Sequence, residues 1–156
     1  MRRCGSCSEC CTALRIDMDD GTNKPMYKKC PSDKGGTRCC SIYDTRPKVC
    51  RKFECAWLQG MGSQSDKPDE LGVIFFLKET ELGVTLHIAE CFPGAHKKIR
   101  ALALARGVSE KNDIAAMVIP HGQSGHDGVR HVLRCPESKT GTLMKMNIVR
   151  TSDLSK

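Results

Sequence analysis

The sequence has few aromatic residues and no long apolar run. Aromatic side chains make up 4% of the 156 residues, and Trp57 is the single tryptophan. Apolar stretches such as 73–77 fall far short of the roughly 18 residues that a membrane span needs. Arg2 and Arg3 are not followed by an apolar segment, so no secretory signal is predicted. We therefore expect a cytoplasmic protein with no membrane segment, whose core depends on aliphatic side chains or on a bound inorganic group.

Motifs of several large enzyme classes are also absent. The sequence contains no G-x-x-x-x-G-K-[ST] phosphate loop, no G-x-G-x-x-G turn, and neither H-E-x-x-H nor G-x-S-x-G. His121, His126 and His131 surround a glycine-rich stretch, which we interpret as a turn-forming loop rather than a set of ligands. Outside the cysteines nothing indicates an active site, so the sequence leaves open whether the protein is an enzyme.

Cysteine is the residue type in excess. The chain holds 11 cysteines, of which nine fall in the first 55 residues, and two pairs are adjacent in sequence. An odd number with vicinal pairs fits a disulfide framework poorly, and cytosolic thiols are kept reduced. A metal site is therefore favoured over disulfides. The two late cysteines, Cys91 and Cys135, are interpreted as small buried apolar side chains.

The net charge of +7 raises the alternative of a nucleic-acid partner. Few aromatic residues accompany the basic ones for base stacking, so nucleic acid is the weaker interpretation. Eight metal-bound thiolates and two divalent ions would together add about −4 and reduce the net charge to about +3. On this interpretation the cations of 46–52, together with Arg2, Arg3, Lys28 and Lys29, are counter-charges that lower thiol pKa values.

Composition divides the chain into a cysteine-rich region, 1–60, and an α+β region, 61–156, joined by a polar connector at 60–70. We expect both regions to form one compact α+β domain. In the first region a helix is predicted over 44–60, with Pro47 in its first turn. In the second region we expect a hairpin of 72–78 and 84–90, a helix over 93–107 that ends at Gly107, and strands at 114–120, 129–135 and 142–149. The fold class is thus a small irregular cysteine-rich module packed on a hairpin, helix and strand unit.

The spacing of the first cysteines indicates metal chemistry. Cys4-x2-Cys7-x2-Cys10 is the local part of a bacterial-type [4Fe–4S] run, and each C-x-x-C turn is equally the knuckle of many zinc sites. Cys11 follows at once, where a ferredoxin would have three further residues before its next cysteine. Cys50 and Cys55 would point about 140° apart on an unbroken helix, so either the helix bends or the two thiols serve different centres.

These elements resemble the CxxCxxCC (YkgJ-like) cysteine cluster family, which carries a zinc- or iron-chelating domain. The shared pattern is C-x2-C-x2-C-C, a middle cysteine, and then C-x-I-Y followed by R-P-x-x-C-R-x-F-x-C-x-W-L, and it covers residues 4–60. The resemblance implies a metal domain with the ligands Cys4, Cys7, Cys10, Cys11, Cys30, Cys40, Cys50 and Cys55. It also implies a framework of Ile42, Tyr43, Arg46, Pro47, Arg51, Phe53, Trp57 and Leu58. Cys39 lies outside the pattern.

Three functions remain open at this point. The preferred one is a metal-binding protein in which zinc is held by cysteine thiolates, in a structural or metal-handling role, with no protein partner or substrate indicated. The alternative is an iron–sulfur protein with a [4Fe–4S] cluster and an oxidoreductase or methyl-transfer role, because relatives of the family carry such labels. The third is a zinc-dependent nucleic-acid-binding module, which rests on charge alone. The adjacent Cys10 and Cys11 leave open whether there are one or two metal centres.

Overall fold

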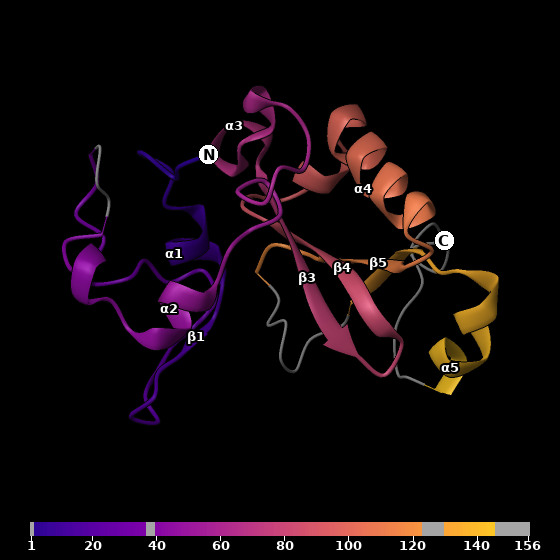
Figure 1. The fold of residues 1–156 in the computed structure, drawn as a ribbon, viewed down its shortest axis with the longest axis horizontal. Coiled ribbons are helices and arrows are strands. Elements are labelled where there is room, and N and C mark those ends of the chain that lie inside the picture. The colour runs from indigo at the N-terminus through magenta and orange to yellow at the C-terminus, as the bar shows by residue number, and fades with distance from the viewer. Residues whose placement is uncertain (1, 37–39, 123–129, 146–156) are drawn as a thin grey trace.

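The computed structural model describes residues 2–36, 40–122 and 130–145. Its centre is a four-stranded sheet of β3 (Val73–Thr80), β4 (Gly83–Glu90), β5 (Ala115–Ile119) and β6 (His131–Arg134), in that order (Figure 1). Helix α4 (Ile99–Lys111) and helix α5 (Thr140–Lys145) accompany the sheet. The α+β fold class is thereby confirmed. Among these residues, no helix has both the length and the apolar character that crossing a membrane requires.

The order of the strands follows from their connections. β3 and β4 form the expected antiparallel hairpin, with Phe75 opposite Ile88. β4 and β5 are parallel, and a parallel pair requires a long crossover, which α4 supplies. β5 then pairs with β6 in the antiparallel sense, with an irregularity between Ala116 and Met117. The strands expected near 114–120 and 129–135 are thus confirmed, with shorter bounds.

Both faces of the sheet are covered. On one face, Leu86 and Val118 pack with Ala101 and Ala105 of α4. On the other face, one cluster contains residues of the sheet and of the cysteine-rich region, and a second joins the sheet to α5. Because β4 is enclosed from both sides, Thr85 and His87 are as buried as Leu86, and the strand does not show the alternation of a half-exposed arm.

The cysteine-rich region is irregular, as expected, and lies to one side of the sheet (Figure 1). It contains the short helices α1 (Glu9–Ala13) and α2 (Lys48–Lys52), a 3-10 turn at Tyr43–Thr45, and a two-stranded pair of β1 (Ile16–Asp17) and β2 (Asn23–Lys24). Trp57 and Cys55 of this region pack against Ile74, Ala89 and Ile119 of the sheet. The sheet therefore supports a region that has little regular structure of its own.

Two helix predictions were wrong in their bounds. The helix expected over 44–60 ends at Lys52, and Phe53 is extended with ψ 123°. The chain leaves the helix because the Ala56 N–H donates to the Phe75 carbonyl of β3, at 2.7 Å. The helix expected over 93–107 starts at Ile99 and continues through Gly107 to Lys111, since an interior glycine costs only about 1 kcal/mol.

The strand expected at 142–149 was also wrong where the structure describes it. Residues Thr140–Lys145 form α5, and the rest of that segment lies outside the described residues. Leu143 is buried against Met117 and Val132, so packing on the sheet, rather than pairing with it, fixes this segment.

The connector expected at 60–70 carries ordered structure. It contains a 3-10 turn at Gln64–Asp66 and the one-turn helix α3 (Pro68–Leu71). The Asp66 carboxylate accepts hydrogen bonds from the Ser63 backbone and hydroxyl, at 2.6 and 2.7 Å, and so closes a capping box. The division of the chain into regions 1–60 and 61–156 stays a prediction.

Candidate metal centre

The described cysteines of the first 55 residues come from six short elements: the turn before α1, α1 itself, two loops, α2 and the segment after α2. Cys4 and Cys7 lie in the turn before α1, where the Cys7 N–H donates to the Cys4 carbonyl at 3.0 Å. All ten described cysteines are free thiols, and Cys39 lies outside the described residues. The eight expected ligands are Cys4, Cys7, Cys10, Cys11, Cys30, Cys40, Cys50 and Cys55.

The adjacent Cys10 and Cys11 occupy α1, where consecutive side chains point about 100° apart. Cys10 packs toward the sheet, in the cluster that also contains Cys55. Cys11 joins another loop through its backbone, because the Cys30 N–H donates to the Cys11 carbonyl at 3.1 Å. A hydrogen bond between the two thiols raises the pKa of Cys10 and lowers that of Cys11, so Cys11 is the more acidic thiol of the pair.

Electrostatic interactions relate the eight thiols in two overlapping neighbourhoods, which Cys11 connects. Burial raises the pKa of Cys4, and charge on Cys55 and Cys11 raises it further. Charge on Cys4 and Cys7 in turn raises the pKa of Cys10. Burial raises the pKa of Cys50, as does charge on three cysteines from other segments, Cys11, Cys30 and Cys40. We call Cys4, Cys7, Cys10 and Cys55 the first thiol group, and Cys11, Cys30, Cys40 and Cys50 the second thiol group.

Two cations lie beside these groups. The Lys24 ammonium is buried and donates to the carbonyls of Thr12, Pro25 and Lys28, at 3.1, 2.8 and 2.8 Å. Burial lowers the pKa of Lys24, while charge on neighbouring cysteines raises it. The Arg46 guanidinium lies 4.0 Å from the centre of the Tyr43 ring. Both cations lower the pKa of Cys11.

Sequence reasoning named other counter-charges and overlooked Lys24. Arg2, expected among the counter-charges, instead donates to the carbonyls of Trp57 and Met61, at 2.7 and 2.8 Å. A lone lysine in a polar loop gives no sequence signal of burial, because the three carbonyls that hold it converge only in the folded loop. Arg46 was named correctly, and its positive charge lowers the pKa of Cys4, Cys11 and Cys50.

Within the described part of this region, two buried polar atoms have no hydrogen-bond partner. They are Nε of Arg46, a donor, and Oδ2 of Asp33, an acceptor. An unsatisfied buried polar group costs about 1–3 kcal/mol, and more when it is charged. An unpaired donor beside the thiols is expected where a thiolate is to bind, and an unpaired acceptor is expected where a cation is to bind.

Cys91 was interpreted as a small buried apolar side chain, but it lies close to the first thiol group. It follows β4 and is half-buried against the cluster that contains Cys55. Burial raises its pKa, as do the Glu9 carboxylate and charge on Cys7. Cys135 is half-buried against the α5 cluster, as expected, and its thiol faces the Pro136 carbonyl at 3.5 Å.

No described histidine forms a metal-binding group with the thiols. His121 stacks on Tyr27 with ring centroids 4.4 Å apart, and its backbone N–H donates to Glu90 at 3.0 Å. His131 lies in β6, and His126 falls outside the described residues. Glu90 is buried and accepts from Nδ1 of His96. These contacts are structural, and they close the end of the sheet against the cysteine-rich region.

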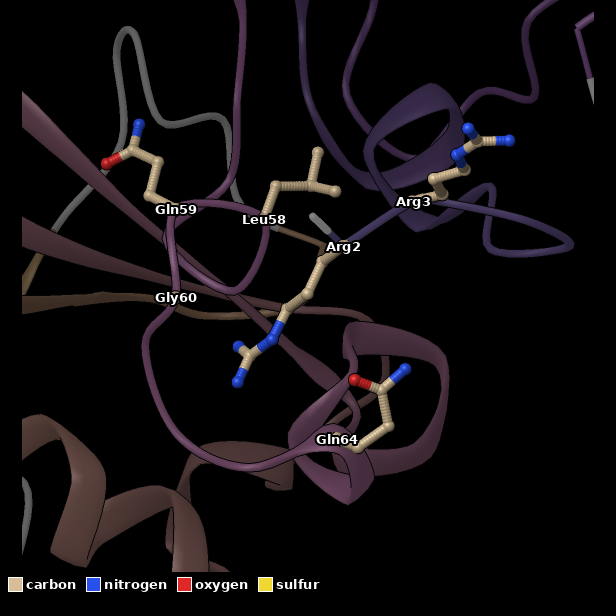
Figure 2. A pocket seen from close by; sticks show the side chains of 6 residues that line it. All are labelled: Arg2, Arg3, Leu58, Gln59, Gly60 and Gln64. Carbon is tan, nitrogen blue, oxygen red and sulfur yellow. The ribbon is translucent and has the colours of Figure 1, made fainter.

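A surface hollow lies beside the N-terminus, between Arg2, Arg3, Leu58, Gln59, Gly60 and Gln64 (Figure 2). No acid, thiol or histidine lines it, and the Arg2 guanidinium is held there by backbone carbonyls. It therefore offers no group for acid–base or nucleophilic chemistry.

The donor set suits a soft or borderline metal. Thiolates select zinc, copper(I) and iron–sulfur clusters, and two sets of four match the number of ligands in a structural tetrathiolate zinc site. Among residues 2–36, 40–122 and 130–145, however, no three His, Cys, Asp or Glu side chains already converge to hold an ion. The residues fit the metal by the chemistry of their donor atoms.

Comparison with known proteins leaves this chain without an assigned relative. No family model matches it, and no curated protein or solved structure does so.

Proposed function

We propose that this protein binds zinc through the cysteine thiolates of residues 4–55, in a structural or metal-handling role. The observation that carries the proposal is that free thiols from separate segments interact with one another and with two cations, the buried Lys24 and the half-buried Arg46. Thiols that raise one another's pKa are poorly accommodated as anions until a divalent cation compensates them. The resemblance to the CxxCxxCC family supports the same function, and we propose membership of that family on its motif.

The two thiol groups give the ligand assignment. The first thiol group would hold one ion against the sheet, and the second would hold another between α1, α2 and the loops of Cys30 and Cys40. Bound zinc would cross-link segments that otherwise have few hydrogen bonds, and so supply folding free energy in place of an apolar core. Free thiols persist in a reducing compartment, so we place the protein in the cytoplasm.

A second candidate, an iron–sulfur cluster, is favoured by one observation. Cys4, Cys7 and Cys10 share a neighbourhood with the distant Cys55, which is the three-plus-one arrangement of a bacterial-type cluster. Such a cluster would supply one-electron chemistry. The oxidoreductase or methyl-transfer role would then need a substrate site that the hollow beside Arg2 does not provide.

Anaerobic purification with metal analysis, sulfide analysis and a visible spectrum separates the two. Zinc binding predicts a colourless protein with about two zinc ions per chain. A brown protein with iron and acid-labile sulfide would establish the second candidate instead, and a metal-free folded protein would refute both. Cys135→Ser serves as the matched control, because Cys135 packs by α5, away from the thiol groups.

The fluorescence emission of Trp57 can be used to follow removal of the metal. Trp57 is 3% exposed, and its indole N–H donates to the Ser63 carbonyl at 3.0 Å. If bound metal holds the cysteine-rich region on the sheet, a chelator should shift the Trp57 emission to the red, and added zinc should reverse the shift. Unchanged emission after complete metal removal would show that the metal is not structural.

A further inference from the structure

The Asp33 side chain is the buried charged group of this region that the thiol motif does not explain. Its side chain is 1% exposed, although it lies in a loop. Oδ1 accepts the Gly35 N–H at 2.9 Å, which is the ordinary bond of a turn. Oδ2 is buried and has no hydrogen-bond partner. A carboxylate in this position needs a cation, because leaving a buried charge uncompensated costs several kcal/mol.

Among the described residues, the neighbouring cations do not supply that compensation. Nζ of Lys29 is 3.9 Å from Oδ2, at the limit of an ion pair, and its side chain is 60% exposed. Exposed pairs of this kind contribute little. Nζ of Lys24 is held by three backbone carbonyls, and Arg46 lies over the Tyr43 ring.

The backbone directs the Asp33 carboxylate toward the second thiol group. Asp33 and Cys40 form an isolated antiparallel bridge, and directly opposed residues of such a bridge project to the same face with Cβ atoms about 5 Å apart. The Asp33 N–H donates to the Cys30 carbonyl at 2.9 Å. Cys11 lies in the same neighbourhood, because the negative charge of Asp33 raises the pKa of its thiol.

We propose that the Asp33 carboxylate is an oxygen ligand in the metal centre of the second thiol group, beside Cys11 and Cys40. The inference rests on the proposed function, and it changes that centre from an all-sulfur site to a mixed sulfur and oxygen site. Zinc accepts carboxylate oxygen as well as thiolate sulfur, and it expands from four ligands to five. An oxygen ligand also makes this centre the more exchangeable of the two, since carboxylate is harder than thiolate.

Anaerobic titration of the full-length, metal-free protein with cobalt(II), followed by competition with zinc, tests the assignment. Asp33→Asn should weaken metal binding at one of the two centres by more than about tenfold, and it should change the ligand-field bands of that cobalt ion. Asp33→Cys should keep the bound metal and strengthen the thiolate-to-cobalt charge-transfer band. Asp44→Asn, an exposed acid of the same region, is the matched control.

The outcomes separate this inference from the function on which it rests. If wild-type protein binds neither cobalt(II) nor zinc, the proposed function fails. If wild-type protein binds and Asp33→Asn has the same affinity and spectrum, the Asp33 assignment is overturned while the function stands. Weaker binding with unchanged ligand-field bands overturns it too, because the carboxylate would then act from outside the coordination sphere. If Asp33→Asn does not fold, an Asp33→Cys protein with the wild-type spectrum overturns it.

Discussion

Asp66 and Arg100 form a two-point ion pair, in which Oδ1 accepts from Nε at 2.8 Å and Oδ2 accepts from Nη2 at 2.6 Å. The pair connects the 60–70 segment to α4, and its carboxylate is 4% exposed while the guanidinium is 55% exposed. Hydrogen bonds from Arg100 and Ser63 hold the pKa of Asp66 well below its usual range. The 60–70 segment, which composition predicts to be a linker, is therefore held against the α+β region by the buried carboxylate of Asp66.

Replacing that carboxylate should destabilise the fold. Asp66→Asn removes the charge that accepts both Arg100 bonds and both Ser63 bonds, so we expect the free energy of unfolding to fall by about 2 kcal/mol. Urea denaturation measures the loss. Glu70→Gln, an exposed acid of the next turn, should change it by less than about 0.5 kcal/mol. Equal effects of the two variants would contradict the role given to the ion pair.

Gly72 and Gly94 provide a matched pair for backbone and packing effects. Both have positive φ, at +85° and +78°, so alanine at either position should cost about 1 kcal/mol of left-handed strain. A Cβ on Gly72 would also meet Cε1 of Phe92 at 2.3 Å, whereas one on Gly94 meets nothing within 4 Å. Thermal or urea unfolding should therefore show Gly72→Ala to be less stable than Gly94→Ala by about 1–3 kcal/mol. Equal losses would mean that the Phe92 ring moves aside without cost.

The buried His87 should make stability depend on pH. Burial lowers its pKa to about 3, with the positive charges of Arg130 and Lys78 acting in the same direction. In the unfolded chain the imidazole titrates near 6.5, so the unfolded state binds more protons between about pH 3 and 6.5. The stability present above pH 6.5 is lost as the pH falls through this window, by about 2 kcal/mol at pH 5.

Substitution isolates this contribution from other acid effects, such as thiolate protonation. In urea denaturation at pH 7 and pH 5, His87→Gln should lose less stability than wild type on acidification. His121→Gln, at an exposed histidine, should follow wild type. A His87→Gln protein with the wild-type pH dependence would show that His87 remains protonated in the fold.

The two thiol groups predict how metal content responds to substitution. Cys4→Ser and Cys50→Ser, one from each group, should each remove about one zinc ion per chain, and the double variant should remove about two. The physical reason is that each group would hold its own ion, so loss of one ligand leaves the other centre intact. Metal analysis of the anaerobically purified variants makes the measurement. If either single substitution released all of the metal, the eight thiols would form one shared cluster.

Local pattern was sufficient for much of the fold. The hairpin of β3 and β4 and the strands β5 and β6 were predicted because apolar runs bounded by turn residues indicate strands whatever their neighbours. The ends of the helices could not be predicted from local pattern. α2 stops at Lys52 because Ala56 bonds to Phe75 of β3, a contact between segments that no local pattern encodes. Helix α5, which forms where a strand was predicted, has the same explanation, since Leu143 packs against Met117 and Val132.

For the candidate site, too, some features could be predicted from the sequence and others depend on the tertiary structure. The sequence by itself determined the eight thiols, their x2 spacings and the positive charge of Arg46, because these are properties of residue type and order. Only the tertiary structure decided that Cys50 neighbours Cys11, Cys30 and Cys40 while Cys10 packs in the cluster that contains Cys55. It also buried Lys24 and Asp33, two charged residues of polar stretches of the sequence. The reason is that burial and electrostatic neighbourhood arise from segments packing across the fold, and α1 turns its two adjacent cysteines toward different segments.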